Sequence, residues 1–306
     1  MPPGVDAGSA RRLGILPVMA LPDMLVDPRW LRAQPSSTRL VIADVRWVPG
    51  GHASGSFALG HLPGAVSVDL DTDLAAPAFQ GPGRHPLPEP RVFAATMSRL
   101  GIGDHTAVVA YDDAGGWIAA RLWWMLRVLG REVALLDLPS LEAWTAEGGT
   151  LETGPPPTRS AATFTTTAWP ADRVVDAHEV GRAVRTRSAV LLDARAGERY
   201  RGETEPIDPV AGHIPGAVGA EWAGDLGDDG HMLDATALRR RYEALGVGER
   251  GTAIASCGSG VTAAFTLFAM ERAGLGLGRL YEGSWSDWVS DRSRPVATGP
   301  DPGDPP

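Results

Sequence analysis

The sequence predicts an α/β protein built from two tandem copies of one unit, each a mostly parallel sheet flanked by helices. The first observation is size, because 306 residues, 43% of them hydrophobic, are enough for two domains. The second is duplication, because the same motifs occur in the same order in both halves. The third is alternation, because short apolar runs alternate with helical stretches such as 118–129 and 262–273.

Three pairs of motifs carry the duplication: a strand-like run ending in Asp-x-Arg, a Gly-His-x-Pro-Gly turn, and a Leu-Gly-x-Gly segment. The pairs are Val41–Arg46 with Val190–Arg195, Gly60–Val66 with Gly212–Val218, and Leu100–Gly103 with Leu245–Gly248. Their offset stays between 145 and 152 residues, a period that indicates two domains rather than a solenoid. Each Asp-x-Arg pair follows a strand, where ligand sites of parallel sheets tend to lie.

Composition places the boundaries of the parts. The segment 148–170 contains a glycine pair and three consecutive prolines, so we expect a linker there. This linker separates a first domain at 17–147 from a second domain at 171–298. The tail at 299–306 is rich in Pro, Gly and Asp and is predicted to be flexible.

Charge and cysteine content restrict the partners and the compartment. The formal charge of −9 and the pI near 5.3 argue against a nucleic-acid partner. A single cysteine forms no internal disulfide, which fits a reducing compartment, and we expect a cytoplasmic protein. The stretch 253–270 lacks charged residues, but its glycines, serines, threonines and cysteine favour a buried strand, loop and helix over a membrane span.

That single cysteine, Cys257, lies in a setting that suits a reactive thiol. It follows the apolar run 253–256 and precedes a glycine-spaced loop and a helical stretch. Gly258 and Gly260 let the backbone curl so that N–H groups point inward, and the following helix adds its positive end. The sequence therefore predicts a stabilised thiolate, which is a nucleophile.

Several of these segments together resemble the tandem-domain rhodanese-type sulfurtransferases, the thiosulfate/3-mercaptopyruvate sulfurtransferase family. They are the Asp-x-Arg pair, the turn Gly212–Val218, the Cys257 loop and the segment Tyr281–Trp288, and the resemblance spans about 24–296. It implies two tandem rhodanese-like domains and a Cys257 persulfide as the intermediate. The loop Cys-Gly-Ser-Gly-Val-Thr is similar to that of mercaptopyruvate enzymes.

The resemblance also implies the partners of the reaction. We expect a small anionic sulfur donor, with 3-mercaptopyruvate favoured, and a thiophilic acceptor such as cyanide or a thiol. A thioredoxin-like reductant is a further candidate partner, and no cofactor is expected. Two alternatives stay open, a thiosulfate sulfurtransferase (rhodanese) and a persulfide-relay or binding protein that accepts sulfur from a protein partner.

Arg199 is the predicted contact for the anionic end of the donor, because it matches the family's arginine in a Gly-Arg-Tyr context. A guanidinium binds carboxylate or sulfonate groups through two parallel hydrogen bonds. The remaining predicted substrate-binding residues are Gly258, Ser259, Gly260, Val261 and Thr262. Mercaptopyruvate enzymes usually carry a second arginine before the glycine-histidine turn, but the stretch 202–211 has none, which weakens the choice of donor.

In the first half, Asp112 stands at the position equivalent to Cys257. A carboxylate forms no persulfide, so we expect this domain to be catalytically silent and to act as a wall of the site. A cysteine-dependent phosphatase needs an arginine six residues after its cysteine, and Ala263 occupies that position. A non-catalytic binding module would be favoured if the cysteine had been lost, and it is present.

The seven histidines show no metal-ligand spacing, so no metal site is expected. His61 and His213 occupy matching turns in the silent and active halves, which favours a structural role for both. His85 has no counterpart in the second half and is a candidate for the cleft between the domains.

Overall fold

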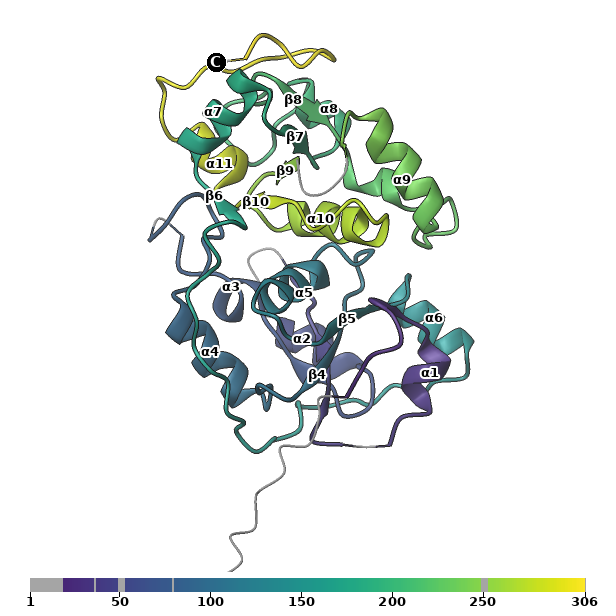
Figure 1. The fold of residues 1–306 in the computed structure, drawn as a ribbon. Coiled ribbons are helices and arrows are strands. Elements are labelled where there is room, and N and C mark those ends of the chain that lie inside the picture. Colours follow the sequence, from purple (N-terminus) through teal and green to yellow (C-terminus); the bar gives the residue numbers. More distant parts are fainter. Residues whose placement is uncertain (1–18, 36, 49–52, 79, 249–252, 306) are drawn as a thin grey trace, which may run out of the picture.

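The computed structural model describes residues 19–35, 37–48, 53–78, 80–248 and 253–305. They form two lobes, each with its own sheet, and the N-terminal half of the chain builds the lower lobe in Figure 1.

The two lobes contain the same type of sheet. The strands of the first are β1 (Leu25–Val26), β2 (Leu40–Asp44), β3 (Val66–Ser67), β4 (Ala107–Tyr111) and β5 (Val133–Leu136). Those of the second are β6 (Val174–Val175), β7 (Val190–Asp193), β8 (Ala217–Gly219), β9 (Ala253–Ser256) and β10 (Arg279–Tyr281). The strand orders are β1-β5-β4-β2-β3 and β6-β10-β9-β7-β8, and every pairing is parallel. The predicted fold class is confirmed.

Helices cover both faces of each sheet. The first lobe has α1 (Pro28–Arg32), α2 (Ala53–Leu59), α3 (Leu70–Asp73), α4 (Pro90–Arg99), α5 (Ala119–Val128) and α6 (Ser140–Ala146). The second has α7 (Ala177–Thr186), α8 (Gly197–Tyr200), the 3₁₀ helix η1 (Trp222–Asp225), α9 (Ala235–Ala244), α10 (Thr262–Arg272) and α11 (Ser284–Trp288). The tail folds back on the second lobe, where Gly299 N–H donates to Arg201 O at 2.8 Å. Its flexibility stays a prediction.

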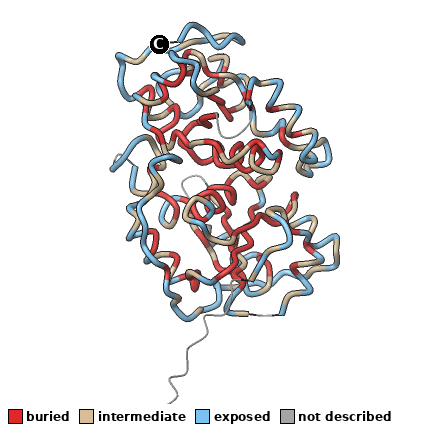
Figure 2. Tube along the Cα trace, viewed as in Figure 1, coloured by how far each residue is buried: buried red, intermediate tan, exposed pale blue. Residues whose placement is uncertain are grey.

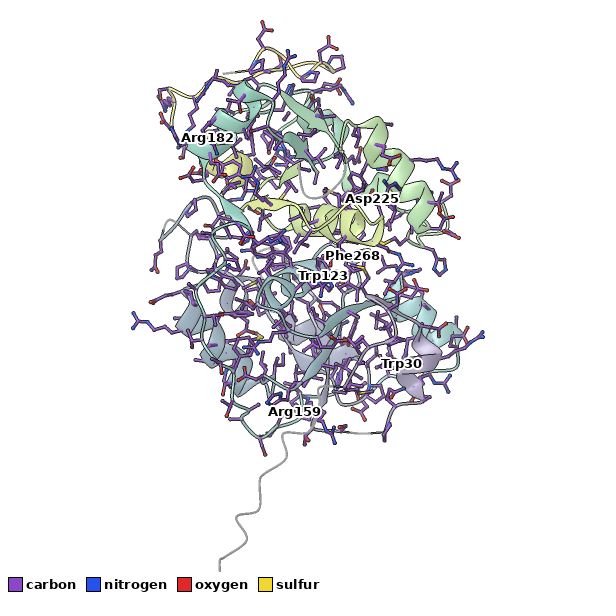
Figure 3. The ribbon with its side chains drawn as sticks, viewed as in Figure 1. Trp30, Trp123, Arg159, Arg182, Asp225 and Phe268 are labelled. Carbon is purple, nitrogen blue, oxygen red and sulfur yellow. The ribbon has the colours of Figure 1, made fainter. Side chains whose placement is uncertain are left out.

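The domain interface is a continuation of the hydrophobic core. Helices α5 and α10 face each other across it, and one buried cluster extends through both lobes (Figures 1 and 2). The rings of Trp123 on α5 and Phe268 on α10 meet edge to face at 4.8 Å between centroids (Figure 3). Apolar burial of this kind fixes the two lobes against each other, so residues of either lobe can form one site.

The register of the second sheet places the cysteine loop. Asp193 at the end of β7 pairs with Ser256 at the end of β9, and Cys257 follows directly. The carboxyl ends of these parallel strands therefore lie side by side, at the edge where such sheets bind ligands. The loops after β7 and β9 both open toward the first lobe, whose residues line the same cavity.

Candidate active site

Cys257 is held in a tight loop between β9 and α10. Its side chain is 2% exposed, and its Sγ accepts a hydrogen bond from the N–H of Gly260 at 3.2 Å. Gly260 adopts φ +78°, and a Cβ at this position would lie 2.3 Å from Glu282 O, so only glycine fits. The sulfur thus faces a backbone donor, as the glycine-spaced sequence predicts.

The sulfur lines a cavity of about 850 Å³ between the two lobes. From the second lobe the lining includes Arg195, Arg199, Trp222, Cys257, Gly258, Ser259, Val261 and Thr262, and from the first lobe Trp47, Leu70, Asp71, Arg84, His85 and Trp117. The structure therefore brings the predicted site residues together at this cavity, except Gly260. Gly260 does not line the cavity but donates its N–H to the sulfur. The first lobe forms the opposite wall.

His85 connects a serine of the cysteine loop to a carboxylate of the first lobe. Its Nδ1 lies 2.7 Å from Ser259 Oγ, and its Nε2 lies 3.1 Å from Asp71 Oδ1. A neutral imidazole that donates from Nε2 to Asp71 accepts the Ser259 hydroxyl proton at Nδ1. Burial and the nearby Arg121 cation lower the pKa of His85, which keeps the ring neutral near pH 7. The arrangement can move a proton to or from the serine hydroxyl.

Two arginines flank Gly258, next to the sulfur. A Cβ placed on Gly258 would lie 2.9 Å from Nη2 of Arg84 and 3.7 Å from both Nη atoms of Arg199. Glu205 Oε1 accepts from Arg199 Nη2 at 2.6 Å, and Asp208 accepts from Arg84. Asp208 also lies 3.5 Å from Arg199 Nη2, so it contacts both guanidinium groups. The same two arginines lie at the cavity, where an anion can bind.

Sequence reasoning missed Arg84, Asp71 and the tryptophans of the cavity. Arg84 directly precedes His85, so the prediction that His85 lies near the cleft could also have pointed to Arg84. Asp71 lies in an Asp-rich helix start that reads as ordinary capping, and nothing in the sequence distinguishes it. The second lobe does lack a second arginine in its loop, but the first lobe places one at the same cavity.

The Asp-x-Arg pair of the second lobe holds its own loop in place at the edge of the cavity. Arg195 binds Asp193 through Nε at 3.0 Å and Nη2 at 2.6 Å, and Nη2 also donates to Gly212 O at 2.7 Å. His213 is fully buried, with Nδ1 2.8 Å from Tyr200 O, and His61 is equally enclosed, with Nδ1 2.9 Å from Phe57 O. These contacts tie each turn to its helix and do not reach the sulfur.

Within the described ranges, no cluster of three or more His, Cys, Asp or Glu side chains is arranged to hold a metal ion. Across the same ranges, no helix is long and apolar enough to cross a membrane.

Comparisons with known proteins agree with this geometry. The family model of the rhodanese-like domain matches residues 27–147 and 176–291. A probable 3-mercaptopyruvate sulfurtransferase of Pseudomonas aeruginosa is 43% identical, covering 90% of this chain and 98% of the relative. A putative thiosulfate sulfurtransferase of Mycobacterium tuberculosis is 40% identical, covering 84% and 90%.

Among solved structures, SseA of Escherichia coli, a 3-mercaptopyruvate sulfurtransferase, superimposes with a TM-score of 0.74 at 31% identity, covering 86% of this chain and 99% of SseA. The family model matches both halves of the chain, and relatives at 40–43% identity match over most of their length. The chain belongs to the rhodanese-like family as a tandem-domain sulfurtransferase.

Proposed function

We propose that the protein transfers sulfur from 3-mercaptopyruvate, through a persulfide on Cys257, to a thiophilic acceptor such as cyanide or a thiol. The hydrogen-bonded series Ser259, His85 and Asp71 carries this choice of donor. It offers a proton beside the sulfur, and mercaptopyruvate is a donor whose leaving group must be protonated.

In the first half-reaction the Cys257 thiolate attacks the thiol sulfur of the donor. An S–S bond forms, the C–S bond breaks, and its electron pair goes to the methylene carbon as the enolate of pyruvate. The Ser259–His85 pair gives that carbon a proton and recovers one from the persulfide S–H, so no net proton is taken up. The persulfide anion then passes its outer sulfur to the acceptor, which regenerates the thiolate.

The donor's carboxylate binds in this proposal between Arg199 and Arg84. Both guanidinium groups flank Gly258, and the carboxylates of Glu205 and Asp208 orient them. Because these two acids already neutralise the two arginines, the site favours a singly charged anion over a doubly charged one.

Thiosulfate is the second candidate donor, and the name of the Mycobacterium tuberculosis relative favours it. Its S–S bond breaks to release sulfite, which leaves with the electron pair and needs no proton. A persulfide relay or binding protein that accepts sulfur from a protein partner remains the other alternative predicted from the sequence. A thioredoxin-like reductant as partner and a cytoplasmic location are part of the proposal.

The two donors are separated by removing the proton relay. We expect Ser259→Ala and His85→Gln to lower kcat with mercaptopyruvate by about 100- to 10,000-fold, the range of general acid–base catalysis. Thiosulfate turnover in the same variants stays near the wild-type rate. Ser290→Ala, at an exposed serine, is the matched control. An equal loss with both donors, or faster wild-type turnover of thiosulfate than of mercaptopyruvate, contradicts the proposal.

A further inference from the structure

Arg121 is a buried cation that the proposed reaction leaves without a role. It lies on α5 of the silent lobe, its side chain is 0% exposed, and its Nε has no hydrogen-bond partner. Among the described residues, no carboxylate oxygen lies within ion-pair distance of it. A buried charge without a close counter-ion costs several kcal/mol. Its burial at this place therefore calls for a compensating function.

The guanidinium joins the two loops that carry the chemistry. Its Nη1 donates to Gly260 O at 3.1 Å, and its Nη2 donates to His85 O at 3.0 Å. Gly260 is also the residue whose N–H reaches the sulfur. One side chain of the silent lobe thus fixes the cysteine loop against the histidine loop, across the domain interface.

The electrostatic contacts of Arg121 point to the same two groups. Burial lowers the pKa of Arg121 to about 10, opposed by the Glu282 carboxylate and by the Cys257 thiolate, so the group is cationic at neutral pH. Arg121 in turn is the largest of the neighbouring charges that lower the pKa of His85. Its charge therefore favours an anion at Cys257 and a neutral ring at His85, which are the states that sulfur transfer needs.

Other charged groups share this environment. Those around the sulfur and the histidine are Arg84, Arg195, Arg199, Asp71, Asp208 and Glu282. Most of these have a direct acidic or basic partner: Arg195 with Asp193, Arg199 with Glu205, and Arg84 with Asp208. Arg121 differs because its charge is not cancelled by a neighbour in contact.

We propose that Arg121 is a positioning residue that also supplies the buried counter-charge for the thiolate and persulfide of Cys257, so that the silent lobe takes part in catalysis. The inference rests on the proposed Cys257 chemistry but not on the identity of the donor. It assigns to α5 a role beyond interface packing.

The test compares Arg121→Gln, which keeps hydrogen-bond donors but loses the charge, with Arg121→Lys, which keeps the charge. The readout is the rate of Cys257 alkylation by iodoacetamide against pH, which needs no sulfur donor and has a single target in the sequence. In the Gln variant we expect the midpoint to rise by about one pH unit, a tenfold slower alkylation on the acid side. In the Lys variant we expect a midpoint near wild type, with turnover reduced because one ammonium cannot reproduce the planar fork.

Arg127→Gln is the matched control, because Arg127 lies on the same helix and pairs with Glu271 instead. Thermal melting establishes that each variant is folded. A folded Gln variant with the wild-type midpoint overturns the proposal. A Lys variant whose alkylation midpoint rises also overturns the proposal. This comparison remains informative even if the Gln variant does not fold. Failure of the proposed function would show differently, as absence of a sulfur adduct in the wild-type protein.

Discussion

Both lobes place a loop and a helix after the equivalent strands β4 and β9, but the two loops hold different groups in different ways. In the first lobe the carboxylate of Asp112 fills its own loop. Its Oδ1 accepts from the N–H groups of Ala114 at 2.9 Å and Gly116 at 2.8 Å, and its Oδ2 accepts from Ile118 at 2.9 Å and Ala119 at 2.8 Å. Burial raises the pKa of Asp112, and these four donors oppose the rise.

In the second lobe the corresponding position holds a sulfur that accepts from the N–H of Gly260 and has an open cavity beside it. The loop is also shorter: Cys257 lies four positions before Val261 at the N-cap of α10, whereas Asp112 lies six before Ile118 at the N-cap of α5. The comparison teaches that the same strand–loop–helix unit can direct backbone N–H groups at the residue after the strand, four of them at Asp112 and one at Cys257. The loops differ in the group that each one holds, a carboxylate with four donors in the first lobe and a thiol beside a cavity in the second.

The largest expected effect comes from exchanging the anions of the two loops. Cys257→Ser removes the single thiol, so we expect no gain of one sulfur atom's mass after incubation with donor, and no turnover. Adding Asp112→Cys to that variant restores neither, because the longer loop presents its N–H groups differently. Intact-protein mass spectrometry and steady-state rates measure both. Turnover in Cys257→Ser would end the covalent mechanism, and a full adduct with wild-type turnover in the double variant would show that residue identity alone silenced the first lobe.

Asp112→Ala tests the claim that the silent loop is satisfied by its own carboxylate. Four N–H groups lose their acceptor, and a buried unsatisfied donor costs about 1–3 kcal/mol, so we expect a loss of at least about 3 kcal/mol in the free energy of unfolding. The folded fraction keeps most of its activity, since Asp112 lies outside the cavity lining. Denaturant titration measures the loss, with the exposed neighbour Asp113→Ala as control. A change below about 1 kcal/mol would mean that water replaces the carboxylate.

Arg199→Ala tests the cavity beside Cys257, where the anionic end of the donor is proposed to bind. Loss of a charge-assisted hydrogen bond of about 1.5–3 kcal/mol lowers kcat/KM by about 10- to 100-fold. Lysine restores part of it, because it cannot present the planar fork. The matched control is Arg201→Ala, whose arginine pairs with exposed Glu203 outside the cavity. A wild-type rate in Arg199→Ala would leave Arg84 as the donor's cation.

The fold and the nucleophile are readable from the sequence because both rest on local patterns. The apolar runs before Asp44 and Asp193 predict buried parallel strands, and the glycines after Cys257 predict a curled loop. These signals lie within a few residues of each other. Duplication doubles the number of these local signals, so the tandem architecture can be predicted from the sequence.

The part of the site that the first lobe contributes is far from Cys257 in the sequence, so sequence patterns predict it poorly. Packing of one lobe on the other brings Asp71, Arg84 and His85 to the cavity of Cys257 and Arg121 to the cysteine loop. Each is separated from Cys257 by more than 130 residues in the sequence. Nothing in the residues around Arg121 distinguishes it from an arginine on a packing helix. Its proposed role depends on its full burial and on its hydrogen bonds to two backbone carbonyl groups, and both arise from the tertiary structure.

The smallest effect distinguishes the lobes at another equivalent pair, Asp73 and Asp225, each 13 residues after the glycine of its Gly-His turn. Asp225 is 0% exposed and accepts from Tyr242 Oη at 2.7 Å and Arg241 Nε at 3.0 Å, whereas Asp73 keeps some exposure and pairs with Arg99. Burial raises the pKa of Asp225 to about 6 and raises that of Asp73 in the same direction.

A raised folded-state pKa means that the native protein holds a proton the unfolded chain releases near pH 4. Stability therefore falls as the pH rises from about 4 to about 6, by about 1 kcal/mol per pH unit for this group. We expect Asp225→Asn to remove that slope, and Asp73→Asn to change it less, in denaturant titrations across this pH range. Equal slopes in the two variants would mean that the lobes bury this carboxylate alike, and a slope of opposite sign would mean that Arg241 outweighs burial and holds Asp225 ionised.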